Sequence, residues 1–330
     1  MDALFTSQVL TEAINQVYPV KTTILDKVFG AKKFLPTGVF SWDIITGSRR
    51  ILKNLKVGDS ATVRDKQGRK TVTCNGARFS EKRFISAADL DKLRGFGEQY
   101  LPQLVGDMIR TELEDIKSDV DRTREYMAAK AITGTIVDDA GVTIVDFGFS
   151  GAQAPVLIGK QKWDDSESNP IKNIRAWKKL ITKAVGSVDK FVAFCGATAM
   201  DALIENEAIL KLLGFSNGKQ IADEGRIINL AGVDIEEITG TYLDSSNVAQ
   251  NLIADAEFIL VGVSSQTAAE IFAPVVDLKD ANGVGSGNPA SMFFSKSWET
   301  EDPSGKWIKG EARPLPILYK PDAIIKATVV

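Results

Sequence analysis

One stretch of the chain repeats apolar residues at the spacing of an unusually long helix. Between residues 98 and 132 they recur every three or four positions, and no glycine lies between Gly106 and Gly134. Pro102 suits the first turn of a helix, and Gly134 suits its C-terminal end. At about 1.5 Å per residue, such a helix is ~45–50 Å long. It must be covered along its length, by its own domain or by neighbouring subunits.

A second stretch, residues 50–83, is strongly basic. It holds ten Lys and Arg and three Asp and Glu, a charge of +7, and because the whole chain carries −3, the rest carries −10. LKVGDSATVRD and RKTVTCNGARF alternate apolar and polar residues around a turn at 65–69, which predicts a β-hairpin. A two-stranded ribbon is marginally stable alone, so we expect it to lie on another surface. The simpler interpretation is a solvated hairpin whose charges discourage indiscriminate strand pairing.

The remaining segments predict a mixture of helices and strands. Residues 135–147 predict a hairpin turning at 139–141, and 171–185 predict a helix started by Pro170 and capped by Asn169. Residues 189–275 predict an α/β unit with strands in DKFVAFCG, RIINLAGVDIEEITG, AEFILVGV and AAEIFAPVV, and a helix in ATAMDALIENEAILKLLG. After a glycine-rich loop, SMFFSKSWET, KWIKGEA and DAIIKATVV predict strands, and ARPLPILYKPD predicts an extended connector. This order is typical of an α+β protein.

Composition and motifs exclude most catalytic chemistry. The chain has no histidine, which excludes Ser-His-Asp and Cys-His catalysis and His-ligated metals. GFSNGK at 214–219 is one residue shorter than a phosphate loop, and the glycines at 281–288 precede a strand, not a helix. The long helix interleaves acidic with basic residues, which favours a solvated or interface face over a metal site. The acidic residues are Glu112, Glu114, Asp115, Asp119, Asp121 and Glu125. We therefore expect no enzyme activity and no cofactor or metal.

The cysteines and the N-terminus indicate an intracellular product. Cys74 and Cys195 lie in apolar or strand-like settings, which favours two reduced thiols, with a single bridge as the alternative. Asp2 and Glu12 lie where a signal peptide would need basic residues followed by an apolar run. Uncharged stretches are shorter than the ~20 residues of a membrane span. A net charge of −3 argues against a general nucleic-acid binder.

Similarity to a known family extends over almost the whole chain. It is carried by VFSWDI, DRTREYMAAKAITGTI, KWDDSESNPIKNIRAW, DKFVAFCGATAMDAL, INLAGVDIEEITGTYL, AEFILVGV and the ending KSWETEDPSGKWIKGEARPLPILYKPDAIIKATVV. In these segments and their order, the chain resembles the major capsid proteins of lambda-type tailed bacteriophages, the phage capsid E family, which have the Hong Kong 97 capsid fold.

The resemblance implies an α+β fold in five parts. These are an N-terminal arm with the first peripheral strand (1–47), an extended loop formed by the basic β-hairpin (48–90), a peripheral domain with the spine helix (91–188), an α/β axial domain (189–275) and a C-terminal return to the peripheral domain (276–330). The hairpin after the spine and the C-terminal strands would complete the peripheral sheet. Contacts between subunits are expected from the basic residues of the extended loop. These residues are Arg50, Lys53, Lys56, Arg64, Lys66, Arg69 and Lys70.

The implied function is that of a major head protein. Such a subunit assembles into hexamers and pentamers of an icosahedral shell around the duplex DNA of a tailed phage, first in the host cytoplasm and then in the virion. Its expected partners are further copies of itself, a scaffold protein, a portal, a decoration protein and packaged DNA bound without sequence specificity, and no membrane. The charge split agrees, because a basic ribbon on an acidic neighbour sets register and orientation more than affinity.

Three alternatives remain at this stage. A bacterial nanocompartment shell has the same fold, and a cargo-enzyme gene beside this one would favour it over the phage shell. An enzyme could use carboxylates or lysines of the long helix between residues 110 and 130. A nucleic-acid module could use residues 50–83, and would show tight, strongly salt-dependent duplex binding.

The absence of histidine predicts how assembly depends on pH. Any pH dependence should follow carboxylates, below about pH 5, because no side chain with an unperturbed pKa near 6.5 is present. Light scattering of assembling protein across a pH series measures this. A sharp midpoint between about pH 6 and pH 7 would contradict the prediction.

Overall fold

The computed structural model describes residues 22–45, 69–75, 77–86, 101–138, 140–207, 209, 225–275, 277 and 290–330. They divide into two units. The first is drawn from Met1–Phe40, Cys74–Ala128 and Glu270–Ile317, and the second from Ser41–Thr73, Ala129–Ala269 and Leu318–Val330. In these described ranges, no helix is long and apolar enough to cross a membrane.

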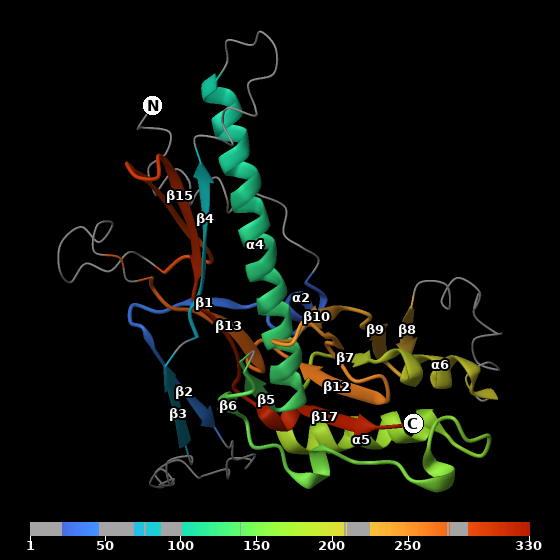
Figure 1. Cartoon of the computed structure of the whole chain (residues 1–330). Coiled ribbons are helices and arrows are strands. Elements are labelled where there is room, and N and C mark those ends of the chain that lie inside the picture. The colour runs from blue at the N-terminus through green and yellow to red at the C-terminus, as the bar shows by residue number, and fades with distance from the viewer. Residues whose placement is uncertain are drawn as a thin grey trace, which may run out of the picture. The chain divides into compact units, whose positions relative to one another are not determined.

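The predicted long helix is present as α4 (Leu101–Thr133), and most of it belongs to the first unit. It runs alongside an antiparallel sheet of β14 (Phe294–Thr300), β15 (Gly305–Ala312) and β4 (Phe79–Ser86), in that order (Figure 1). Helix residues three and four positions apart bury one stripe against the sheet, as the apolar spacing predicts. The shared core consists of Ile85, Ile109, Leu113, Ile116, Val120, Phe293, Ile308 and Ala312.

The central strand of this sheet approaches α4 closely at Gly310. A Cβ at that position would lie 2.5 Å from Cγ2 of Ile116 and 2.5 Å from Cζ of Phe293. A side chain there would displace the helix from the sheet, because a packed core leaves no room for extra atoms.

Buried charges connect α4 to a second sheet of the first unit. Arg124 donates from Nε and Nη2 to the two carboxylate oxygens of Glu270, both at 2.7 Å, and from Nη1 to Asp121 at 2.5 Å. The side chain of Glu270 is 1% exposed and that of Arg124 11%. Burial opposes the charge of Arg124, but hydrogen bonds and attraction from Glu270 and Asp121 raise its pKa overall. Because removing one partner of a buried ion pair leaves the other charge uncompensated, the Arg124–Glu270 pair fixes α4 against the strand that carries Glu270.

The next helix residue, Glu125, caps α2 (Thr23–Val28) from about a hundred positions away. Its carboxylate accepts hydrogen bonds from the backbone N–H of Ile24 at 2.7 Å and of Leu25 at 3.2 Å. Thr22, at the N-cap, makes no side-chain capping bond, so Glu125 fills that role. Burial raises the pKa of Glu125, and the two N–H donors partly offset this effect.

Glu270 lies on β13 (Ala268–Phe272), the middle strand of a sheet between β1 (Lys32–Phe34) and β16 (Pro314–Leu318). β1 runs parallel to β13, with Lys32 opposite Glu270. The sequence predicts only a connector for 312–322, whereas β16 is a fully buried strand. Its position at the sheet edge explains how two prolines are accommodated, because one side of an edge strand needs no N–H donors.

The second unit is built on a five-stranded sheet in the order β17-β12-β7-β9-β8. Its strands are β17 (Ile324–Thr328), β12 (Glu257–Val263), β7 (Lys190–Cys195), β9 (Val233–Glu237) and β8 (Arg226–Leu230). The helices α5 (Pro170–Val185) and α6 (Ala197–Glu205) share one apolar core with the sheet. Trp163, Trp177 and Phe258 form its aromatic centre, with ring centroids 4.9 to 6.1 Å apart.

The start of α5 agrees with the sequence prediction. Pro170 occupies the first turn, and the side chain of Asn169 accepts a hydrogen bond from the N–H of Lys172 at 3.0 Å. The predicted helix after β7 differs from the observed one. It is interrupted at Asn206, whose backbone is extended and whose Nδ2 donates to Ser168 Oγ at 3.0 Å. Its predicted end at Gly214 lies outside the described residues.

Short hairpins and helical turns complete the described chain. The hairpin after α4 is present as β5 (Thr135–Val137) and β6 (Thr143–Asp146). The other two-stranded pairs are β10 (Thr241–Leu243) with β11 (Ala249–Asn251), and β2 (Val39–Ile45) with β3 (Arg69–Asn75). Single turns of 3-10 helix lie at Gly151–Gln153, Gly159–Gln161 and Pro321–Ala323.

The sequence analysis implies that the C-terminal strands complete one sheet. In the structure they belong to three different sheets. β14 pairs with β15, which pairs with β4, whereas β16 lies beside β13 and β17 pairs with β12. Each apolar strand joins a sheet with which it shares a buried core, and the sequence pattern alone does not say which one. The five predicted part boundaries stay a prediction, because the two units reflect internal contacts and not roles in an assembly.

The buried pair predicts a large loss of stability when one partner is removed. Glu270→Ala should lower the free energy of unfolding by about 3–5 kcal/mol, because it leaves the Arg124 guanidinium buried without its main partner. Urea denaturation of the soluble subunit measures this. Glu270→Gln is the milder variant if Glu270→Ala does not fold.

Glu114→Ala is the matched control on α4. Glu114 pairs with Arg110 at 2.8 Å, but Arg110 is 73% exposed, so the loss should stay within about 0.5 kcal/mol. Equal losses for Glu270 and Glu114 variants would show that the buried pair carries no special weight.

Candidate functional site

The residues predicted to contact neighbouring subunits fall mostly outside the described ranges. Arg50, Lys53, Lys56, Arg64 and Lys66 lie there, as does the first arm of the predicted hairpin. Arg69 and Lys70 begin β3, in the second arm. The structure therefore brings none of the predicted contact residues into a described site.

The observed partner of β3 was not predicted from the sequence. β3 pairs with β2, and polar side chains join the two strands. Thr71 Oγ1 donates to Asp43 at 2.7 Å, and Ser41 and Thr73 hydroxyls lie 3.3 Å apart. These polar pairs are exposed, whereas Phe40 and Trp42, which alternate with them along β2, are buried at 0% and 5% exposure.

The end of the basic segment does not belong to that ribbon. Arg78, Lys82 and Arg83 lie on or beside β4, in the first unit, and each has a partner there. The Lys82 ammonium lies 4.6 Å from the ring centre of Trp307, and Arg78 Nε and Nη2 donate to Glu311 at 2.7 and 2.8 Å. Three of the ten basic residues of 50–83 are therefore used inside the subunit. The other seven basic residues of this segment are the predicted contact residues.

Glu311 is the buried acceptor of this region. It is 1% exposed on β15 and also receives Lys309 Nζ at 2.5 Å. Burial alone would raise the pKa of Glu311, but the hydrogen bonds and charges of Arg78 and Lys309 bring it below its ordinary value of 4.5. The ionised carboxylate is thus the form that the folded sheet prefers.

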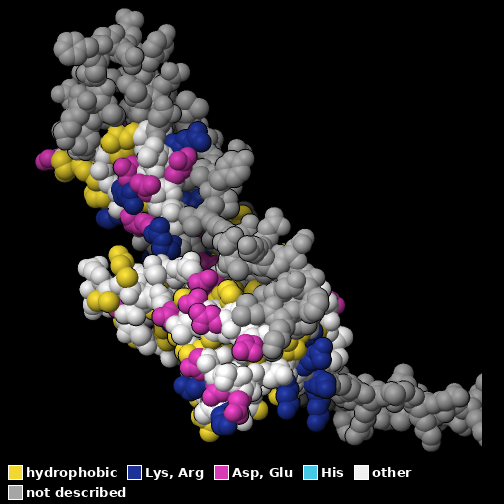
Figure 2. Space-filling model, turned by 90° about the vertical axis from the view of Figure 1, so that its right-hand side faces the viewer, with side chains coloured by type: hydrophobic (Ala, Val, Ile, Leu, Met, Phe, Trp, Pro, Cys, Tyr) yellow, Lys and Arg dark blue, Asp and Glu magenta, His cyan; other side chains and the backbone are white. Residues whose placement is uncertain are grey.

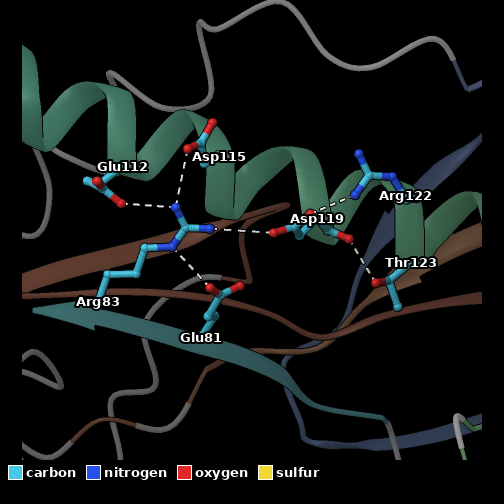
Figure 3. A network of polar contacts seen from close by, with 7 residues as sticks. All are labelled: Glu81, Arg83, Glu112, Asp115, Asp119, Arg122 and Thr123. Carbon is cyan, nitrogen blue, oxygen red and sulfur yellow. Dashed lines mark hydrogen bonds and ion pairs between the residues drawn. The ribbon is translucent and has the colours of Figure 1, made fainter. Parts of the chain in front are cut away.

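Arg83 connects β4 to the acidic face of α4 (Figure 3). Its Nη1 lies 2.9 Å from Glu112 and 3.2 Å from Asp115, its Nη2 lies 3.6 Å from Asp119, and its Nε lies 3.1 Å from Glu81. Hydrogen bonding to Glu112 raises the pKa of Arg83, against the effect of burial. One guanidinium thereby holds four carboxylates, so this face of the spine helix is organised by a strand and is not simply solvated.

The remaining helix carboxylates separate into two kinds. Glu114 makes an exposed pair with Arg110, as the interleaved charges predict. Asp121 and Glu125 are 2% and 8% exposed, so the expected solvated or interface face is wrong for them. Both carboxylates can be buried because they have hydrogen-bond donors: Arg124 for Asp121, and the backbone of Ile24 and Leu25 for Glu125. No sequence pattern predicts these partners. Among the residues that the structure describes, no group of His, Cys, Asp or Glu could hold a metal ion.

Exposed apolar side chains of the second unit are further candidate contacts that sequence reasoning missed. Val156 and Ile158 are 64% and 71% exposed in the loop before α5, and Leu243 and Val248 are 66% and 52% exposed around the β10–β11 turn. Large exposed apolar groups that gather in one region mark interaction surfaces. In the sequence, Val156 and Ile158 cannot be told from core residues, because they lie in the apolar stretch APVLIG.

The two cysteines are free thiols. Cys195 is buried on β7, and burial, with the nearby charge of Glu237, raises its pKa. Cys74 on β3 is partly buried, and burial raises its pKa as well. Neither thiol is activated as a nucleophile, because activation requires a lowered pKa.

The environment of Glu311 predicts a pH-dependent contribution to stability. Because its pKa is lowered in the folded state, Glu311 stabilises the fold above about pH 4.5, and this contribution is lost as pH falls through the folded pKa. Glu311→Gln should therefore cost about 2–3 kcal/mol at pH 7, and much less near pH 3. Urea denaturation at both pH values measures this. Glu299→Gln is the control, because Glu299 is 78% exposed; a Glu311 difference that does not depend on pH would contradict the assignment.

A family profile matches almost the whole chain. The profile of the family described as phage major capsid protein E matches residues 6–329. A search of curated proteins gives no match.

Solved structures resemble the chain over nearly its whole length. A protein assigned as the capsid protein of an E. coli CFT073 prophage is 17% identical, with a TM-score of 0.65 over 98% of this chain and 99% of that one. A phage-related protein of Bordetella bronchiseptica RB50 is 11% identical, with a TM-score of 0.59 over 98% and 97%. The capsid of cyanophage P-SCSP1u is 9% identical, with a TM-score of 0.55 over 96% and 90%. The fold is thus that of phage capsid proteins, and because the family profile covers almost every residue, the chain belongs to the phage major capsid protein E family.

Proposed function

We propose that this phage major capsid protein forms the hexamers and pentamers of an icosahedral shell that encloses the duplex DNA of a tailed phage. The match of the family profile to residues 6–329 carries the proposal. The protein acts through contacts and not through catalysis, since the role of the family is structural. It works in the virion, after assembly in the host cytoplasm.

The distribution of charge supports contacts through the extended loop. Arg78, Lys82 and Arg83 have partners inside the first unit, so they are not available to neighbours in the same way. Residues 50–70 still hold seven Lys and Arg against two Asp. This segment meets the acidic remainder of a neighbouring subunit, and the charges orient the two before short-range contacts form.

Other partners follow from the same role. A scaffold protein, a portal and a decoration protein bind the growing or finished shell, and packaged DNA lies inside without sequence-specific contacts. Individual subunit contacts can be weak, because each subunit touches several neighbours and the effective concentration is high. A nanocompartment shell is the alternative, and a cargo enzyme copurifying with the shells would favour it.

Neutralising the extended loop should impair assembly. The loop variant Lys53→Gln, Lys56→Gln, Lys66→Gln, Lys70→Gln should assemble about tenfold more slowly at low salt, because electrostatic steering of the loop is lost. Light scattering follows the rate, and electron microscopy shows whether shells form.

The control variant removes the same charge elsewhere. It carries Arg110→Gln, Arg122→Gln, Lys160→Gln and Lys190→Gln, four exposed positions outside the loop. It should assemble at close to the rate of the unaltered protein. If the unaltered protein gives no shells with its scaffold, the proposed function is wrong; if both variants slow equally, the loop contacts are wrong.

A further inference from the structure

The helix α5 is the most one-sidedly basic element of the described chain. Its sixteen residues, Pro170–Val185, include five basic side chains and no acidic one. The chain as a whole carries −3, so this helix departs strongly from its surroundings. Its apolar face, through Ile174, Trp177 and Ile181, packs into the core of the second unit. The basic residues are Lys172, Arg175, Lys178, Lys179 and Lys183.

Four of these cations form one row on the outer face of α5. Lys172, Arg175, Lys179 and Lys183 are exposed and follow each other at intervals of three, four and four residues. At about 1.5 Å per residue, the row is ~16 Å long. None of the four forms an ion pair with a carboxylate of the described ranges. Figure 2 shows Lys and Arg side chains, with Asp and Glu among them, in the lower part of the face that it draws.

A shallow groove lies along the row. It has a volume of about 860 Å³ and is lined by Arg175, Lys178, Lys179, Thr182, Lys183, Gly186 and Ala231. Only one residue of this lining has an apolar side chain, and that is a single methyl group. Most of the wall is therefore formed by the aliphatic stems of the basic side chains, and no large apolar side chain is among the lining residues.

Lys178 fixes the wall of the groove. Its Nζ donates to the carbonyl oxygen of Ala231 at 2.8 Å and to that of Gly232 at 3.2 Å, and lies 4.8 Å from the ring centre of Phe191. Burial, and the charge of Arg175, lower the pKa of Lys178. This lysine is thus committed to the turn between β8 and β9, and the other four cations remain available to a ligand.

The composition of the face favours phosphate over an acidic protein surface. The buried centres of protein interfaces are depleted in lysine and rely on aromatic or other apolar anchors. Interfaces with nucleic acid are polar, and a row of Lys and Arg along one helix is their usual mark. No base-reading geometry is needed, because contacts to phosphate carry affinity without sequence information.

We infer that the outer face of α5, formed by Lys172, Arg175, Lys179 and Lys183, binds the phosphate backbone of duplex DNA. The inference rests on the proposed function, which supplies the DNA, and adds the surface that meets it. The face would then be turned toward the interior of the shell.

The expected binding is weak and strongly dependent on salt. Four phosphate contacts give a slope of about −3.6 in a plot of log K against log salt, which is about a 100-fold loss between 50 and 200 mM salt. Such contacts release DNA readily at physiological ionic strength. This agrees with a shell filled by a packaging motor, because a tight grip on DNA would oppose its movement.

The test compares the unaltered protein, the α5 variant and the control variant defined above. The α5 variant carries Lys172→Gln, Arg175→Gln, Lys179→Gln and Lys183→Gln, and leaves Lys178 in place to preserve the turn. Fluorescence anisotropy with a short labelled DNA duplex of mixed sequence measures affinity over about 50 to 200 mM salt. The unaltered protein should bind at low salt with the stated slope, and the α5 variant should lose at least tenfold in affinity. The control variant removes the same charge and should lose less than about threefold.

Three outcomes would overturn the inference. They are no duplex binding by the unaltered protein at low salt, equal losses for the two variants, and a loss of self-association by the α5 variant without a loss of duplex binding. The last would assign the face to another copy of the chain. Duplex binding is measured on unassembled protein, because a face inside a closed shell is not accessible to added DNA. Electron microscopy of separate samples assembled with the scaffold then separates this inference from the proposed function. Shells formed by a protein whose unassembled form shows no α5-dependent binding contradict the inference alone, whereas no shells from the unaltered protein contradict the proposed function.

Discussion

The buried guanidinium of Arg124 sets a constraint on which the first unit depends. A charge in that position is costly to desolvate and is tolerated only with Glu270 and Asp121 in hydrogen-bonding range. Neighbouring Glu125 meets the N-terminal N–H groups of α2. Successive helix residues point about 100° apart, so the two contacts together fix both the height and the rotation of the spine helix. A slip by one residue would leave both charges buried without partners.

Hydrophobic packing on the sheet of β14, β15 and β4 follows from that fixed position. The stripe from Ile109 to Val120 lies over β15, and Gly310 allows the close approach. On the exposed side of this packing, the Arg83 guanidinium forms ion pairs with carboxylates on successive turns of α4. They are Glu112, Asp115 and Asp119. Apolar burial supplies most of the stabilisation, while the charged groups select one arrangement among several that would bury a similar area.

The basic residues divide into those that have partners inside the subunit and those that remain exposed. Arg78, Lys82 and Arg83 stabilise the subunit from within, because each lies against a carboxylate or a ring of its own sheet. The exposed cations of the outer face of α5 have no ion pair with a carboxylate of the described ranges. In the proposed shell, the first kind makes the subunit rigid, and the second kind is left for contacts with other molecules.

The sequence by itself determined the elements with strong local signals. The spacing of apolar residues predicted α4 to within three residues at each end, Asn169 and Pro170 predicted the start of α5, and the family resemblance predicted the fold. Only the tertiary structure decided which sheet each C-terminal strand joins, that Asn206 interrupts α6, and that Asp121 and Glu125 are buried. It also decided which basic residues have internal partners. The reason is physical: helix periodicity and capping act between residues a few positions apart, whereas strand pairing and buried charge depend on groups such as Arg124 and Glu270, which are 146 positions apart.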